Sequence, residues 1–308
     1  MMIAGFYGWA GERETSAVGS SGAGRPGVRR RADPLLDSRP RWSTDHPVMC
    51  LILFAQGVHP DFPLIVAANR DEFHARPTAP AAFRDDTPTV LAGRDLEAGG
   101  SWMGVDRRGR FAAVTNYTEP PPDPLPPRTR GELVMDFLQG DAEPGAYLDA
   151  VARRGPEYRG FNLLVGDAAG LWYFSNRLEE SEHPLRLEPG IYGLSNHLLD
   201  TDWPRVNRGK SALSDFERAE AHPDVEELLA LLGDTTEPRD EEIMAVPDGA
   251  RGPGARMPCF ITGDAYGTRA STVLLQQRDG RIRFVEQRWG PAGARDGRTD
   301  ETFDRRPA

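Results

Sequence analysis

The chain has 308 residues, of which 39% are hydrophobic and 27% charged, and its formal net charge is −10 at pH 7. This composition is typical of a soluble globular protein with one large domain or two modest ones. The acidic balance excludes the clustered Lys and Arg surface that nucleic-acid binding requires. No apolar run approaches the ~18 residues of a membrane helix. We therefore expect neither a nucleic-acid partner nor a membrane span.

The chain holds two cysteines, Cys50 and Cys259, and six histidines. Two cysteines do not make a disulfide framework, which favours a reducing, cytoplasmic setting. The histidines lack metal-ligand spacing. No phosphate-binding loop, dinucleotide fingerprint or C-x-x-C-H haem attachment motif is present. The sequence therefore predicts no metal site and no bound cofactor.

Residues 1–48 are rich in Gly and Arg and show no hydrophobic period. Such a segment cannot bury enough apolar area to offset its ordering entropy. It also lacks the basic region and sustained apolar core of a secretory signal. We interpret these residues as a disordered leader or a start assigned too far upstream, and place one folded domain at residues 49–290. Residues 291–308 are predicted to be a disordered tail.

Short β-rich runs separated by Pro, Gly and Asp follow Met49. Two pairs of helical segments interrupt this series of strands. A hairpin turns at Asp106–Gly109 and another at Asp279–Gly280. The expected strands lie at 50–56, 63–71, 89–95, within the 101–119 hairpin, and at 161–167, 170–176, 191–196, 260–263, 271–280 and 281–289. The expected helices lie at 129–139, 143–155, 206–221 and 223–234, the first after a stiff proline-rich connection at 120–127. Strands joined by tight turns, without βαβ alternation, predict an antiparallel α+β fold.

Cys50 lies directly after Met49, at the first residue of the first strand. A lone cysteine in a strand is often a small buried hydrophobe. If the methionine is removed, however, Cys50 carries both a thiol and an α-amine whose reference pKa is about 8. The amine can then serve as general base for the thiol, as in N-terminal-nucleophile hydrolases.

Polar side chains follow the strand at 63–71, in the run Asn69-Arg70-Asp71-Glu72. Since side chains alternate along a strand, Asn69 and Asp71 share one face and Arg70 and Glu72 the other. A solvated strand end explains the run equally well. On the core face, an amide and a carboxylate need partners, and the Cys50 amine is a candidate.

Three further polar residues flank strands: Asn116, Asn196 and Arg269. Singly, each is an ordinary strand-end or turn residue. Together with the earlier run, they supply amides that could act as oxyanion donors and an arginine that could hold a thiolate or an anionic substrate.

The segments MCLILFA, AANRDEFHARPT, LAGRDLEAGGSWMGV, GRFAAVTNY, RGELV, YGLSN and YGTRASTVLL follow one another in this order. In these segments the chain resembles, from Met49 to about Trp289, the NRDE family, also called the Transport and Golgi organisation 2 family. That family is similar to N-terminal-nucleophile hydrolases of the penicillin V acylase and bile salt hydrolase type. The resemblance implies an αββα sandwich, a cysteine behind the initiator methionine, and a pocket of Arg, Asp and Asn side chains.

The resemblance also implies roles for individual residues. Cys50 would be the nucleophile, Asp71 the carboxylate that orients its α-amine, and Arg269 the late arginine beside the nucleophile. Asn116 and Asn196 would contact the oxyanion or the substrate amide.

Five more residues are candidates for binding: Asn69, Arg70, Glu72, Arg94 and Trp102. Arg70 adjoins the aspartate and is expected to face away from it, whereas in the acylases the early arginine precedes the aspartate by several residues. Trp102 matches a family position but is also typical of core packing. Arg94 could line a pocket mouth or a solvated strand end.

Two functional hypotheses follow. The first is a cysteine amidohydrolase or acyltransferase that acts on an N-acyl or thioester small molecule. The second is a non-catalytic binding or trafficking protein for haem or acyl-lipid ligands, since eukaryotic members of the family are implicated in Golgi organisation and in haem- or lipid-related trafficking. A third reading treats the motifs as scaffold. The partner is thus a small molecule (acyl amide, acyl thioester or haem), and the oligomeric state stays open.

Overall fold

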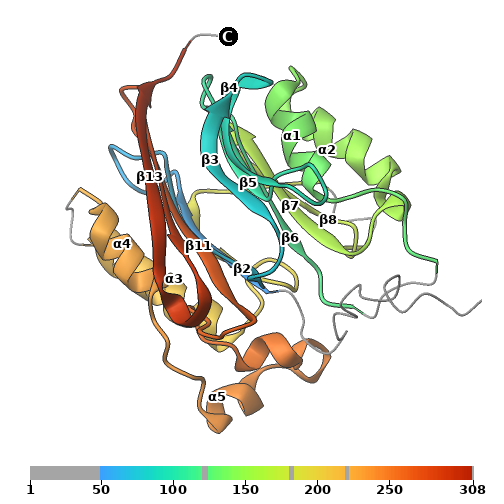
Figure 1. The fold of residues 1–308 in the computed structure, drawn as a ribbon, viewed down its shortest axis with the longest axis vertical. Coiled ribbons are helices and arrows are strands. Elements are labelled where there is room, and N and C mark those ends of the chain that lie inside the picture. Colours follow the sequence, from blue (N-terminus) through green and yellow to red (C-terminus); the bar gives the residue numbers. More distant parts are fainter. Residues whose placement is uncertain (1–48, 120–123, 180–183, 219–221, 307–308) are drawn as a thin grey trace, which may run out of the picture. The chain divides into compact units, whose positions relative to one another are not determined.

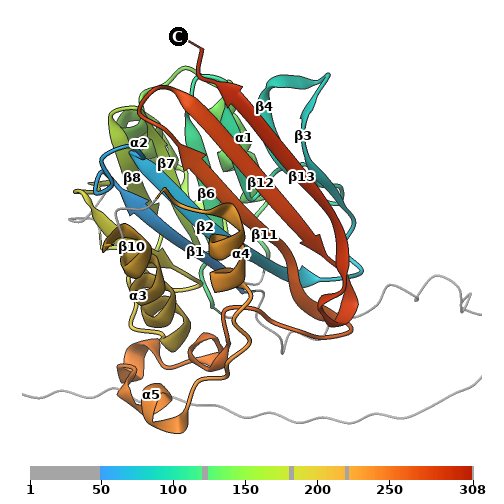
Figure 2. The same ribbon diagram turned by 90° about the vertical axis from the view of Figure 1, so that its left-hand side faces the viewer.

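The computed structural model describes residues 49–119, 124–179, 184–218 and 222–306. Within them the chain forms two antiparallel sheets, seen edge-on in Figure 1 and turned by 90° in Figure 2. The predicted leader, residues 1–48, and the start of the predicted proline-rich connection, residues 120–123, lie outside the described residues. Among the described residues, no helix combines the length and apolar character needed to cross a bilayer.

The first sheet has the strand order β10-β1-β2-β11-β12-β13. In the centre of this sheet β2 pairs with both β1 and β11. The sheet therefore joins strands from the two ends of the folded chain. In spatial order, the strands span Gly190–Leu194, Cys50–Gln56, Leu64–Phe73, Tyr266–Gln276, Arg281–Trp289 and Arg295–Asp304.

The second sheet is a meander of strands that follow one another in the chain, β3 to β9. They span Thr78–Arg84, Thr87–Asp95, Met103–Asp106, Phe111–Asn116, Phe161–Asp167, Gly170–Ser175 and Leu185–Arg186. The predicted turn at Asp106–Gly109 is confirmed, and Gly109 has the positive φ of +83° that this turn needs.

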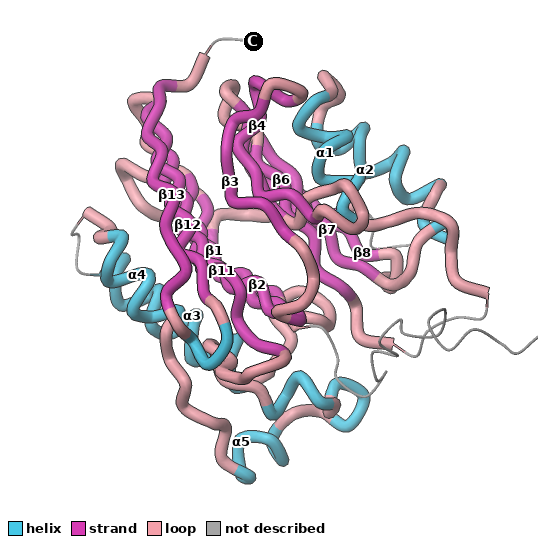
Figure 3. The backbone as a smooth tube through the Cα atoms, in the orientation of Figure 1, coloured by secondary structure: helices cyan, strands magenta, loops and turns pink. Residues whose placement is uncertain are grey.

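Helices cover the outer face of each sheet, as the tube in Figure 3 shows. The helices are α1 (Gly131–Gln139), α2 (Pro144–Arg153), α3 (Pro204–Arg218), α4 (Val225–Leu232) and α5 (Asp240–Ala245), with 3-10 turns at Gly155–Glu157, Asp248–Ala250, Pro253–Arg256 and Pro291–Gly293. Helices α1 and α2 pack on the second sheet, while α3 and α4 pack on the first. The predicted α+β fold with αββα layers is therefore confirmed.

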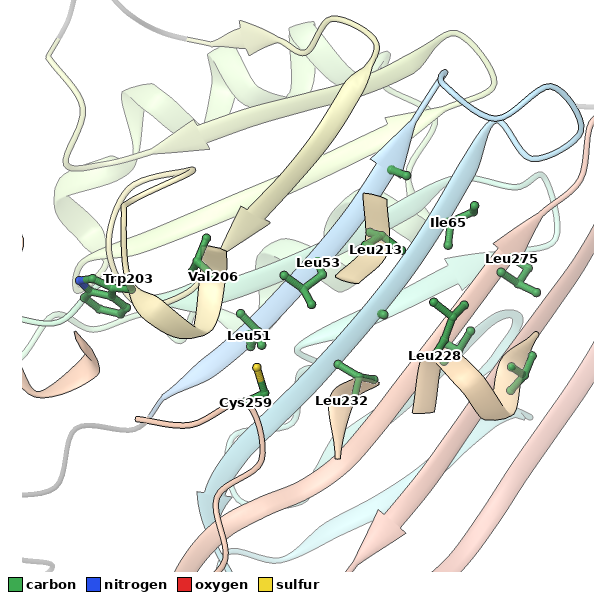
Figure 4. Packing of buried hydrophobic residues seen from close by; sticks show 14 of the residues in the cluster. Leu51, Leu53, Ile65, Trp203, Val206, Leu213, Leu228, Leu232, Cys259 and Leu275 are labelled. Carbon is green, nitrogen blue, oxygen red and sulfur yellow. The ribbon is translucent and has the colours of Figure 1, made fainter. Parts of the chain in front are cut away.

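Three apolar clusters fill the layers and show which way each strand residue faces. Ile52 and Phe54 of β1 pack between the two sheets, with Leu164 of β7. Leu51 and Leu53, which alternate with them, pack on the opposite face against α3 and α4, where Figure 4 shows them. A third cluster joins the second sheet to α1 and α2.

The predicted disordered tail is wrong over Arg295–Asp304, which forms β13. This strand pairs with β12, and Arg283 and Asp300 form an ion pair of 2.9 Å across the two strands. Phe303 packs edge-on against Phe83, with ring centroids 5.3 Å apart. Because β13 is an exposed edge strand, its residues are mostly polar and lack the alternation that identifies a half-buried strand.

The strand predicted at 260–263 is also absent. Phe260 and Ile261 lie in a loop instead, since both edges of β11 are already paired with β2 and β12. In this loop the N–H of Phe260 donates to the carbonyl of Asp234 at 2.8 Å, and that of Ile261 to Thr268 Oγ1 at 2.9 Å.

Candidate functional site

Cys50 begins β1 directly opposite Arg70 of β2. Residues opposite each other in an antiparallel pair project to the same face, and the alternation of β1 puts this face between the sheets, with Ile52. The Cys50 side chain is only 7% exposed. Burial, together with the charge of Asp71, raises the pKa of the thiol to about 12, against a smaller lowering by a hydrogen bond from the Asp71 backbone and by the Arg70 guanidinium.

The backbone of Cys50 is held by two side chains that follow β10. Its N–H donates to Asn196 Oδ1 at 2.6 Å, and its carbonyl accepts from Ser195 Oγ at 2.6 Å. Thr115 of β6 donates to the Ser195 carbonyl at 2.8 Å, which links this segment to the second sheet. The structure thus brings Asn196 and Ser195 to the backbone of Cys50, with the Asn196 amide oxygen on the Cys50 nitrogen.

Asp71 lies on the opposite face of β2, toward α3 and α4, and is completely buried. Thr268 donates its Oγ1–H to Asp71 Oδ1 at 2.6 Å, and Arg205 donates from Nη2 to Oδ2 at 3.0 Å. Burial raises the pKa of Asp71, while the Arg205 charge and the Thr268 hydrogen bond oppose that rise. Each carboxylate oxygen therefore accepts a hydrogen bond from a neighbouring side chain.

Asn69 shares the Asp71 face, as the period of two predicts. Its Nδ2 donates to the carbonyls of Leu232 and Cys259, at 2.9 and 2.8 Å, and its Oδ1 accepts from Ser271 Oγ at 2.6 Å. These bonds fasten the end of α4 and the loop before β11 to β2. The structure therefore does not bring the Asn69 amide to the thiol.

Arg70 and Glu72 lie on the other face, with the thiol. The Arg70 guanidinium is 3.4 Å from Glu72 Oε2, and these side chains are only 12% and 10% exposed. Arg70 does face away from Asp71, as expected, but this is the face that Cys50 occupies. Among the described residues, Arg70 makes only this one long side-chain hydrogen bond, so its remaining donors can serve a ligand.

Arg269 lies at a β-bulge between Thr268 and Ala270. Its Nη1 donates to the carbonyls of Phe73 and Arg76, both at 2.9 Å. Burial and the charge of Arg70 lower its pKa. Its guanidinium thus fastens the β2–β3 connection, lies near Arg70, and makes no hydrogen bond to the Cys50 thiol.

Among the described residues, no hydrogen bond joins the other three predicted residues to Cys50. Asn116 ends β6 opposite Phe161, which packs in the cluster under α1 and α2. Trp102 packs against the core between the sheets. Arg94 forms an ion pair of 2.5 Å with Asp86 at the β3–β4 turn.

Three side chains close to Cys50 or Asp71 are not among the residues predicted from the sequence: Tyr266, Arg130 and Arg205. The Tyr266 hydroxyl accepts a 2.6 Å hydrogen bond from the N–H of Met49. Arg130, at the start of α1, donates to the Gly160 carbonyl at 3.1 Å. Burial and the charge of Arg159 lower its pKa to about 10, while the Cys50 thiolate acts in the opposite direction. Tyr266 and Arg130 lie in or beside quoted family segments; Arg205 carries no signal in the sequence.

A glycine pair sets the position of α1 beside the loop that precedes Trp102. The Ser101 N–H donates to the Gly131 carbonyl at 3.1 Å. A Cβ at Gly100 would collide with the backbone of Gly131. Gly100 is therefore required by this close backbone approach, and a Cβ at Gly131 would lie within 3.2 Å of the Gly100 and Ser101 backbone.

The raised pKa of the thiol leads to a testable expectation. While Cys50 is joined to Met49, iodoacetamide should label it slowly at pH 7–8, because the thiolate is the reactive form. Its rate should rise about tenfold per pH unit toward the pKa of about 12. Peptide mapping separates Cys50 from Cys259, whose pKa burial raises to about 11. A labelling rate that levels off near pH 8 would contradict the structure.

Comparison with known proteins places these features in a family. A family model described as Transport and Golgi organisation 2 matches residues 49–291. The chain is 39% identical over 263 residues to the human Transport and Golgi organization protein 2 homolog, covering 78% of this chain and 92% of the relative. It is 29% identical over 266 residues to the Drosophila melanogaster Transport and Golgi organization protein 2, with the same coverage.

Two solved structures are also similar to the chain, both at low identity. One is the Caenorhabditis elegans ortholog of N-acylethanolamine-hydrolyzing acid amidase, with a TM-score of 0.37 and 11% identity, covering 73% of this chain and 92% of that one. The other is a mutant of the conjugated bile acid hydrolase from Clostridium perfringens, with a TM-score of 0.37 and 9% identity, covering 83% and 92%.

Proposed function

The chain belongs to the Transport and Golgi organisation 2 family, and on this premise we propose that it is a cysteine amidohydrolase or acyltransferase that acts on an N-acyl or thioester small molecule. Cys50 acts as the nucleophile once the chain before it has been removed. The neutral α-amine takes the proton of the thiol, and the sulfur bonds to the acyl carbon. The bond to the leaving group breaks, and the ammonium returns the proton to it. Water or an acceptor then releases the acyl group from the thioester.

One observation carries this proposal: the backbone nitrogen of Cys50 donates to a side chain, Asn196 Oδ1, at 2.6 Å. Backbone N–H groups in a sheet ordinarily donate to the carbonyl of a neighbouring strand. A side-chain acceptor suits a free α-amine equally well, since it does not depend on the peptide bond to Met49. The Asp71 backbone hydrogen bond to the thiol opposes part of the rise that burial causes in the pKa of Cys50.

A second candidate function is non-catalytic binding of an anionic ligand such as haem or acyl-CoA. The arrangement that favours it is the pair Arg70 and Arg130, which act electrostatically on the Cys50 thiol. Guanidinium groups are the preferred protein partners of carboxylates and phosphates.

A single trapping experiment separates the two functions. A chain that begins at Cys50 is incubated with the p-nitroanilide of decanoic acid, quenched in acid and analysed by mass spectrometry. The proposal expects release of p-nitroaniline and a decanoyl adduct on the peptide that begins with Cys50. A matched chain that retains Met49 should give neither.

The alternative has its own readout. If neither product nor adduct forms and haem or palmitoyl-CoA raises the melting temperature, the binding function is correct and the enzyme proposal is not. If neither ligand raises the melting temperature, the binding candidate is excluded.

A further inference from the structure

A buried arginine, Arg205, carries an inference about how the amine of Cys50 is controlled. It lies in the first turn of α3 and is 1% exposed. Its Nη2 donates to Asp71 Oδ2 at 3.0 Å and to the Cys259 carbonyl at 3.1 Å. Its Nε and Nη1 are buried without a hydrogen-bond partner among the described residues.

This arrangement is costly if its purpose is stability alone. A buried donor without a partner is destabilising, and an apolar side chain in place of a buried ion pair is often as stabilising as the pair. The surroundings of Arg205 are apolar: Val206 and Trp203 lie in the cluster that Figure 4 shows, where Leu51 and Cys259 also lie. A charge held here at such a cost points to an electrostatic role.

The β1–β2 register places Asp71 beside the Cys50 nitrogen, which becomes an α-amine when Met49 is removed. Cys50 pairs with Arg70, so one step further along each strand Met49 lies opposite Asp71, on the face of α3 and α4. Met49 is completely buried in this cluster. Removal of Met49 opens the Cys50 amine toward the face of β2 that carries Asp71. Asn196 can still accept a hydrogen bond from the Cys50 nitrogen.

A buried carboxylate alone would be harmful to a catalytic amine. An opposite charge within about 4–6 Å favours the charged form by 1–3 pKa units, so an unpaired Asp71 would hold the amine as an ammonium that cannot accept the thiol proton. A cation on the far side of the carboxylate cancels much of this attraction.

We propose that Arg205 is a positioning residue that neutralises and orients Asp71, so that Asp71 receives the Cys50 amine without fixing it in its charged form. This inference rests on the proposed function. Arg205 of α3, Tyr266 of β11 and the Cys259 thiol act on the amine and Asp71 from the Asp71 face of the sheet. Arg70 and Glu72 of β2 and the Cys50 thiol act from the opposite face.

The pH profile distinguishes this role from a structural one. In a chain that begins at Cys50, kcat/KM for the decanoyl p-nitroanilide is measured from pH 5 to 10. On the acidic side of this profile, kcat/KM falls as the amine becomes protonated. Arg205→Met should raise the midpoint pH of this fall, the acid limb of the profile, by about one unit or more, because the unpaired carboxylate raises the amine pKa. Arg205→Lys should keep the wild-type midpoint. A uniform loss of activity with an unmoved midpoint would overturn the proposal.

If Arg205→Met does not fold, a second pair of variants tests the effect of Arg205 on the amine. Asp71→Asn should lower the pH of the acid-limb midpoint, because the Arg205 charge is then unopposed and lowers the amine pKa. Asp71→Asn with Arg205→Met should return it upward by about one unit. Equal midpoints in these two proteins would overturn the proposal.

The alkylation rate of Cys50 with iodoacetamide, measured over the same pH range, reports the amine and thiol without turnover. Shifts in this rate with no hydrolysis in any variant would refute the proposed function and leave the Arg205 inference standing.

Discussion

Replacing Cys50 with alanine in a chain that begins at residue 50 is expected to lower kcat/KM for acyl p-nitroanilide hydrolysis by on the order of 10³-fold or more. The alanine removes the group that forms the thioester, and loss of a nucleophile is among the most severe changes an enzyme can undergo. Cys259→Ala is the matched control. Its thiol is also buried, but it lies in the cluster under α3 and contacts the Arg205 carbonyl at 3.6 Å, so the activity should stay within a few-fold of wild type.

Hydrolysis by Cys50→Ala at the wild-type rate would show that the thiol is not the nucleophile. Circular dichroism spectra and melting temperatures of the two variants establish that both are folded. Equal losses in Cys50→Ala and Cys259→Ala, at unchanged stability, would also contradict the assignment.

Replacing Arg205 with methionine should lower the free energy of unfolding by about 3–5 kcal/mol, because it leaves Asp71 as an uncompensated buried charge. Both side chains of this pair are 0% exposed, which excludes screening by water. Urea unfolding of folded protein measures the change.

The matched control lies on the same helix. Lys210 forms a 2.8 Å ion pair with Asp200, and these side chains are 28% and 33% exposed. Lys210→Met should therefore cost only about 0–1 kcal/mol. A cost below 1 kcal/mol for Arg205→Met as well would mean that the Asp71 charge is not held by Arg205 in the folded protein.

Period-two alternation correctly predicted which face each polar side chain of β2 takes. It assigned Asn69 and Asp71 to one face of β2 and Arg70 and Glu72 to the other, because side-chain direction in a strand depends only on parity. The same rule could not tell which face the thiol takes. That depends on the register between β1 and β2, which pairs Cys50 with Arg70 and is set by the packing of both strands.

Other parts of the site had no local signal. Arg205 reaches Asp71 across 134 positions of sequence, from a helix whose pattern predicts only that one side is buried. The hydrogen bond between Tyr266 and Met49 spans 217 positions, and depends on β11 pairing with β2 in the centre of the first sheet. The order of distant strands in a sheet is set by how the complete core packs. No single segment of the sequence contains that information.

The proposed function requires a free amine at Cys50, and the N-terminus of the protein from its native cells tests this most directly. N-terminal sequencing and intact mass are measured on the same sample. We expect a chain that begins with Cys50, in which the α-amine makes the hydrogen bond to Asn196. A population in which Met49 or any earlier residue is retained throughout would contradict it.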